Sequence, residues 1–139
     1  MVEKLTELGT ARLVPLVTAR GVAEATESAR ARLERGVIEA CKQCGRNTLM
    51  EIGAAASLAA LSAALPPDSL RLIAHPDGAP LDTFLPATAR EIVAAVGPEG
   101  GFDDEEIATA ERSGFKRVSL GPHILRIETA AIALAAKLL

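Results

Sequence analysis

Two segments of the chain combine sharp-turn residues with side chains that can take part in chemistry. The first reads VGPEGGF at residues 96–102, and the second reads LGPHILRIE at residues 120–128. Each segment follows a run of strand-forming residues, so the backbone turns sharply and leaves N–H and C=O groups free to face a ligand. We therefore expect the two loops to contribute to one pocket.

The elements around these loops indicate an α/β domain. Strands are expected at residues 11–17, 49–52, 70–74, 91–96 and 115–120, and helices at residues 4–8, 27–44, 57–65, 103–113 and from 126 onward. Strands that alternate with helices predict a mainly parallel sheet flanked by helices. The apolar run at 91–96 is expected to be a central strand, buried on both faces. Ligands of such sheets bind beyond the carboxyl ends of the strands, where residues 75–78 form a third loop.

The order of several motifs resembles one family. The motifs are KLTELG at residues 4–9, EACKQCGR at 39–46, the two loops and the last helix, which together cover nearly the whole chain. Each pattern alone is weak, but their shared order is specific to the ribosomal RNA uridine-N3 methyltransferases that act on the small subunit. This family is a branch of the SPOUT superfamily. The resemblance implies a C-terminal trefoil knot, in which the chain from about Ser119 onward passes through a loop made by the preceding segment.

The resemblance also implies a cofactor, a substrate and a partner. The cofactor is S-adenosylmethionine, held bent with its adenine among main-chain groups, and the substrate is a uridine N3 in 16S ribosomal RNA. Two identical subunits are expected to pack across the pocket as a homodimer. The expected cofactor-binding residues come from the three loops: His75, Pro76, Gly78, Val96, Gly97, Pro98, Glu99, Gly100, Gly101, Leu120, Gly121, Pro122, Ile124 and Leu125.

The loop at residues 97–101 has alternative interpretations. Composition alone favours a tight turn that joins a buried strand to a capped helix. Glycine amides before a helix could instead bind a phosphate. The carboxylate of Glu99 and the missing lysine of the GxxxxGK[ST] motif argue against that interpretation. A neutral adenosine that carries a positive sulfonium suits this loop better than a triphosphate does.

Arg126 and two glutamates are the candidate catalytic residues. Arg126 lies at the start of the last helix, where the helix dipole disfavours a cation, so it needs a specific partner. That partner is either a carboxylate, from Glu128 or Glu99, or the RNA. Uracil N3 must lose a proton, and the site therefore needs a base or a cation that stabilises the anion. We hypothesise that Arg126 stabilises charge on a uracil oxygen, while Glu99 or Glu128 orients Arg126 or accepts the proton.

Arginines near the N-terminal half are candidate RNA contacts. Arg12, Arg20 and Arg46 could contact phosphates, with ordinary surface charge as the alternative. The family usually has a Ser-Glu-Arg-Ser-like loop where this chain has TARG at residues 18–21, so only Arg20 matches. Family members also carry a PUA-like RNA-binding barrel ahead of this point. We therefore expect residues 1–139 to be a catalytic domain from which that barrel is absent.

Composition limits how this domain could hold RNA. The chain has 15 Lys and Arg against 18 Asp and Glu, a net charge of -3, which is the wrong sign for binding by bulk electrostatics. Aromatic residues make up 2%, with no Trp or Tyr, which leaves little for base stacking. RNA contacts must therefore come from a local patch or another domain. No membrane-spanning run or secretory signal is evident, which predicts a soluble, cytoplasmic protein.

The cysteines and histidines are not expected to bind metal. Cys41 and Cys44 form a single CxxC, whereas a structural zinc needs four ligands. They lie at helical spacing near the C-terminal end of the helix at 27–44, and a redox CxxC would instead lie at a helix N-terminus. We expect two buried thiols. His75 and His123 are expected to be solvent-exposed loop imidazoles.

Two other classes of function fit the same sequence. One is a catalytically silent RNA-binding or ribosome-binding module that keeps the knotted fold. The other is an α/β oligomerisation domain, for which the apolar helix at residues 130–136 would supply a buried face. Binding of S-adenosylmethionine separates the oligomerisation domain from the other two, and methyl transfer separates the enzyme from the silent module.

Overall fold

A computed structural model describes residues 1–21, 26–85 and 89–138 of the chain. Helices and strands alternate along it in the following order: α1 (Val2–Glu7), β1 (Arg12–Leu13), β2 (Leu16–Val17), α2 (Glu27–Cys44), β3 (Glu51–Ile52), β4 (Ala56–Ser57), α3 (Leu58–Ala63), β5 (Leu70–Pro80), the 3-10 helix η1 (Leu81–Phe84), β6 (Ile92–Ala95), α4 (Asp104–Arg112), β7 (Lys116–Ser119) and α5 (Ile127–Leu138).

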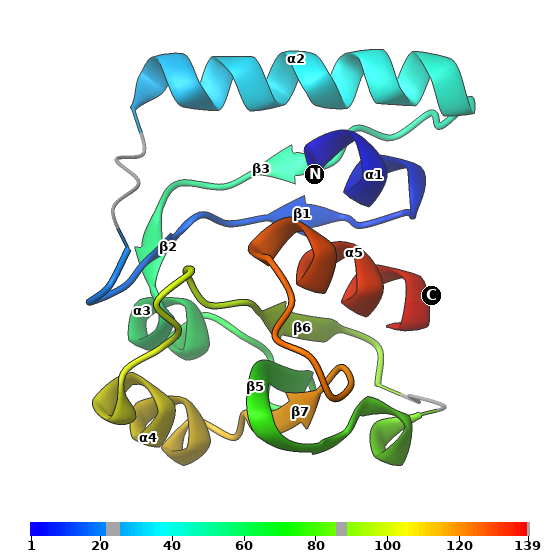
Figure 1. The fold of residues 1–139 in the computed structure, drawn as a ribbon. Coiled ribbons are helices and arrows are strands. Elements are labelled where there is room, and N and C mark those ends of the chain that lie inside the picture. The colour runs from blue at the N-terminus through cyan, green and yellow to red at the C-terminus, as the bar shows by residue number, and fades with distance from the viewer. Residues whose placement is uncertain (22–25, 86–88, 139) are drawn as a thin grey trace.

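Every strand pairing among the described residues is parallel. Strand β1 pairs with β3, β2 pairs with β4, and β5 lies between β6 and β7 in a three-stranded sheet. In Figure 1, α2 lies beyond β3 and β1 on one side of the molecule, and α3 and α4 lie on the other side. The structure thus confirms the predicted fold class, a mainly parallel α/β sheet flanked by helices.

The central strand β5 divides the core between its two faces. Neighbouring residues of a strand point to opposite faces, and both Leu72 and Ile73 are fully buried. Leu72 packs in a cluster with Leu134 of α5, whereas Ile73 packs in a cluster with Ile107 of α4. Burial of each large aliphatic side chain contributes about 1.5–3 kcal/mol to folding. The two clusters therefore fix α5 and α4 on opposite faces of the sheet.

The helix boundaries follow local sequence signals. The side chain of Thr26 accepts a hydrogen bond from the N–H of Ala29 at 3.2 Å, and α2 ends at Gly45, whose φ of 73° is left-handed. Helix α4 begins with a capping box, in which Asp103 and Glu106 each accept a hydrogen bond from the other's backbone N–H. Both ends of α2 and the start of α4 were predicted correctly.

Two predictions about strands were wrong. The run at 91–96 is not a central strand buried on both faces, because β6 forms the edge of its three-stranded sheet and Ala94 is exposed. The single strand predicted at residues 11–17 is interrupted at Pro15 and forms β1 and β2, which pair with different partners. Proline has no N–H to donate to a sheet, which accounts for the interruption.

Two predictions about side-chain exposure were also wrong. Cys41 is buried in the cluster between α1 and α2, but Cys44 is exposed, because Cys41 is the last residue of α2 that belongs to that cluster. The side chain of His75 is only 24% exposed, because it faces α4. His123 is exposed, as predicted. No described helix combines the length and the apolar character needed to cross a bilayer.

Candidate functional site

The three predicted loops leave the same edge of the sheet. Strands β5, β6 and β7 are parallel neighbours, so their carboxyl ends point in one direction. Ala74, Val96 and Leu120 each come directly before one loop, and all three pack in the cluster that contains Leu134 of α5. The structure therefore brings together three segments that lie far apart in the sequence, at the edge where parallel sheets bind ligands.

The first loop is an excursion within β5. Ala74 and Ala79 both face Val118 of β7, so residues 75–78 bulge out between them. A Cβ added to Gly78 would lie 2.5 Å from the backbone N and C of Val118, which makes glycine necessary there. The N–H of Asp77 donates to Nδ1 of His75 at 3.2 Å and closes the bulge. Gly78 thus lets the loop return across β7.

The side chain of His75 points away from the cluster shared by the three loops. It lines a surface depression of about 410 Å³ together with Ile107, Glu111 and Arg117. Arg117 donates to both carboxylate oxygens of Glu111, at 2.6 and 2.9 Å. This hydrogen bonding lowers the pKa of Glu111 and raises that of Arg117. The imidazole of His75 therefore lies among polar groups on the α4 side of the sheet.

The second loop joins β6 to α4 through a tight turn. The N–H of Gly101 donates to the C=O of Pro98 at 2.8 Å, and Gly101 has a φ of 70°. A Cβ at Gly97 would lie 3.0 Å from the ring of Phe102, so the ring lies directly against this glycine. Glu99 is exposed at the tip of the loop. The plain structural interpretation as a strand-to-helix turn is correct, and it leaves the tip free to contact a ligand.

The third loop precedes α5 and is open to solvent. Gly121 has a φ of 134°, with nothing within 4 Å of the position that a Cβ would occupy. Ile124 is 90% exposed, an unusual position for a large apolar side chain, and Leu125 is half-buried. The N–H and C=O of Gly121 lie 3.4 and 3.2 Å from Oγ of Ser119. This loop therefore offers an exposed apolar side chain to a ligand or a partner.

The three candidate catalytic side chains are exposed. Arg126 comes directly before α5, and its C=O accepts the N–H of Ala130 at 2.9 Å. Glu99 and Glu128 are exposed as well. Within the described ranges, no ion pair joins Arg126 to either glutamate. Among the described residues, the ion pair predicted between Arg126 and Glu99 or Glu128 is therefore not formed.

The three candidate RNA-contacting arginines all have partners inside the protein. Arg46 donates to the C=O groups of Thr6 and Thr10 at 2.9 and 2.8 Å, which ties the end of α1 to the end of α2. Arg12 forms an exposed ion pair with Glu51 at 3.2 Å. Arg20 donates to the C=O of Gly100 at 2.8 Å, a contact that sequence reasoning missed.

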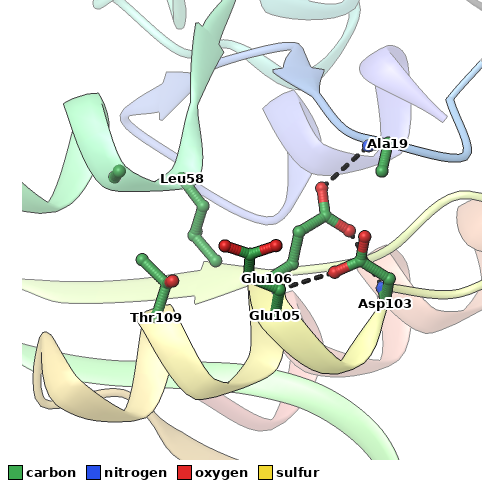
Figure 2. Close-up of a pocket in the computed structure, with 7 residues that line it drawn as sticks. Ala19, Leu58, Asp103, Glu105, Glu106 and Thr109 are labelled. Atoms are coloured by element: carbon green, nitrogen blue, oxygen red, sulfur yellow. Dashed lines mark hydrogen bonds between the residues drawn. The ribbon is translucent and has the colours of Figure 1, made fainter.

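A depression of about 310 Å³ lies beside the second loop, over α4 (Figure 2). Its lining includes the carboxylates of Asp103, Glu105 and Glu106, and two of these complete the capping box of α4. The depression lies on the α4 face, whereas the residues before the three loops pack toward α5. We therefore place the candidate site at the three loops and not in this depression.

A parallel α/β domain with glycine-rich loops at the carboxyl edge of its sheet belongs to the class of α/β domains whose ligands bind at that edge. Comparison with known families makes the class specific. The chain belongs to the family of RNA methyltransferase domains, whose family model matches residues 1–139.

Named relatives and a solved structure agree with this family. The chain is 34% identical to ribosomal RNA small subunit methyltransferase E of Synechocystis sp. over 97% of its own length, and 35% identical to that of Aquifex aeolicus over 100%. It spans 46% and 61% of those two proteins. A structure of ribosomal RNA small subunit methyltransferase E from Neisseria gonorrhoeae bound to S-adenosyl methionine has a TM-score of 0.90 at 33% identity, covering 98% of this chain and 57% of that one.

Proposed function

We propose that this chain is the S-adenosylmethionine-binding, catalytic domain of an enzyme that methylates small-subunit ribosomal RNA. The observation that carries the proposal is the meeting of three loops, after β5, β6 and β7, at one edge of a parallel sheet. The match of the family model to all 139 residues supports the same function. The chain spans about half the length of these relatives, so the activity of the whole protein on ribosomal RNA is part of this proposal.

The residues at the sheet edge suit an uncharged adenosine group that is bonded to a positively charged sulfonium. Glu99 places a carboxylate at the tip of the second loop, and that loop has no lysine to hold a phosphate. Around Gly101 and Gly121 the positions of an added Cβ are open, so no side chain or backbone covers that side of either glycine. We assign adenine recognition to the main chain and apolar side chains of residues 120–125. When bound, S-adenosylmethionine would supply an electrophilic methyl group.

More specifically, we propose that the methyl acceptor is N3 of a uridine in 16S ribosomal RNA. At neutral pH this nitrogen carries a proton that must leave before or during attack. Arg126 would stabilise the negative charge that develops on a uracil oxygen, and Glu99 or Glu128 would accept the proton or orient the arginine. Arg126 is exposed, and among the described residues no ion pair joins it to either glutamate, which supports a role in contacting an incoming base.

The proposal includes a knot and a dimer. The close passage of Gly78 over the backbone of Val118 is consistent with a crowded threading point before the segment from Ser119 onward. In α5, Ala130 and Leu134 are buried within the chain, while Ile132 and Ala133 are only half-buried. The half-buried residues and Ile124 would pack against a second, identical subunit. We place the whole protein in the cytoplasm, together with ribosomal RNA, and propose no metal for it.

Two measurements test the function. Calorimetry of the chain with S-adenosylmethionine should detect one site per subunit, and absence of binding would refute the cofactor assignment. Methyl transfer to small ribosomal subunits should then be measured with the chain in its full-length protein. Cofactor binding without any transfer would favour the catalytically silent RNA-binding module.

Arg126→Ala tests the catalytic assignment. The variant should lose at least about a hundredfold in methyl transfer, the usual effect of removing a group that stabilises a developing oxyanion. Its affinity for S-adenosylmethionine should stay within a few-fold, because the arginine is assigned to the RNA base. Arg30→Ala is the matched control, since Arg30 is an exposed arginine on α2, ion-paired with Glu34. Turnover that survives in Arg126→Ala would refute the assignment.

A further inference from the structure

We propose that Arg20 positions the cofactor loop at residues 97–101, and that it does not act as an RNA phosphate contact. This inference rests on the proposed function, in which that loop binds S-adenosylmethionine. The Nη1 group of Arg20 donates to the C=O of Gly100 at 2.8 Å, across 80 residues of sequence. Hydrogen bonds from a charged donor are among the stronger ones in proteins.

The aliphatic part of Arg20 also packs on the loop. A Cβ added at Gly100 would lie 3.4 Å from both Cβ and Cδ of Arg20. The arginine stem therefore covers this face of Gly100 and leaves room for van der Waals contact with it. Hydrogen bond and packing together place Arg20 against one residue of the loop from two directions.

A second contact holds the segment that carries Arg20. The N–H of Ala19 donates to Oε1 of Glu106 at 2.9 Å, as Figure 2 shows. The other carboxylate oxygen of Glu106 accepts the N–H of Asp103 at 3.0 Å within the capping box. The N–H of Gly21 donates to the C=O of Thr18 at 3.2 Å and closes a turn. Residues 18–21 are thus anchored both to the loop and to the start of α4.

This arrangement gives Arg20 an indirect effect on cofactor affinity. Within the loop, the backbone hydrogen bond found is the one from Gly101 to Pro98, so contacts from outside set the loop's position relative to the sheet. A loop that is already held in its bound shape loses less entropy when a ligand binds. Removal of Arg20 should therefore weaken binding of S-adenosylmethionine even when no RNA is present.

The test compares Arg20→Ala, Arg20→Lys and the control Arg30→Ala. Hydrogen–deuterium exchange of residues 96–102 is measured without ligand, and calorimetry then gives the affinity for S-adenosylmethionine without RNA. Arg20→Ala should exchange faster in this loop and bind S-adenosylmethionine roughly five- to tenfold more weakly, the loss expected for one exposed hydrogen bond of ordinary net strength. Arg20→Lys should recover most of the slow loop exchange and most of the affinity for S-adenosylmethionine, because the Gly100 carbonyl needs a single donor. Arg30→Ala should behave as wild type.

The two readouts separate this inference from the proposed function. Unchanged loop exchange in Arg20→Ala would overturn the positioning role, whether or not the wild type binds the cofactor. If Arg20→Ala keeps its affinity for S-adenosylmethionine but binds RNA more weakly, the positioning role is also overturned. Arg20 would then be an RNA phosphate contact. If the loop exchanges faster in Arg20→Ala but the wild type binds no S-adenosylmethionine, the proposed function is refuted and the positioning contact stands.

Discussion

Gly78 provides a direct test of how closely the first loop passes the sheet. Replacing it with alanine adds one methyl group at a position 2.5 Å from the N and C atoms of Val118 and 2.6 Å from its Cα. Non-bonded carbon atoms prefer a separation of about 3.5–4.0 Å. The alanine would therefore have to move the loop by about 1 Å, and Val118 has little freedom to yield, because it is fully buried in β7.

The expected cost of Gly78→Ala follows from this overlap. Extra methyl groups in a packed interior typically cost about 1–3 kcal/mol. Because the atoms in the way belong to a backbone, we expect the upper part of that range, about 2–3 kcal/mol. For a chain of this size such a loss corresponds to a decrease in Tm of roughly 6–15 °C.

Thermal unfolding followed by circular dichroism measures this effect, with Gly100→Ala as the control. At Gly100 an added Cβ meets only the flexible stem of Arg20, at 3.4 Å, so Tm should change by less than about 4 °C. Gly78→Ala should also weaken binding of S-adenosylmethionine, since its loop moves at the proposed site. A Tm of Gly78→Ala within about 2 °C of the wild type would show that β5 does not cross β7 this closely.

Two further predictions concern polar contacts. Arg71 donates to the C=O groups of Leu65, Pro66 and Ser113 and to Oγ of Ser69, so Arg71→Ala should lower stability by about 2 kcal/mol in urea unfolding. Arg71→Lys should recover less than half of this loss, because an ammonium lacks the planar fork, and full recovery would contradict the geometry. The hydrogen bond from Arg117 lowers the pKa of Glu111, so its stabilising contribution is present above the ordinary value of 4.5 and disappears as pH falls through the lowered pKa. Glu111→Gln should therefore flatten the acid side of a plot of urea midpoint against pH, and an unchanged slope there would refute the assignment.

Local signals were sufficient for many of the elements. The limits of α2 were predictable because Thr26 supplies a capping hydroxyl and Gly45 tolerates a left-handed φ. The capping box of α4 was predictable because its two partners, Asp103 and Glu106, lie three residues apart. In each case the groups that satisfy the backbone are close in sequence, so no knowledge of the rest of the fold was needed.

Contacts between distant segments could not be predicted in this way. Nothing in the sequence indicates that Arg20 would meet Gly100 or that Glu106 would accept the N–H of Ala19, because these partners are 80 and 87 residues apart. The same limit explains the prediction of β6 as a central strand. An apolar run reports burial, but its place in the sheet depends on which strands pair with it.

By itself the sequence determined which segments turn, which begin or end helices, and the resemblance to one family, because these properties depend on neighbouring residues. The tertiary structure alone decided that β5 lies between β6 and β7 and that Arg20 lies on the second loop. Such features depend on packing and on hydrogen bonds between residues far apart in the chain, and those interactions exist only once the chain has folded.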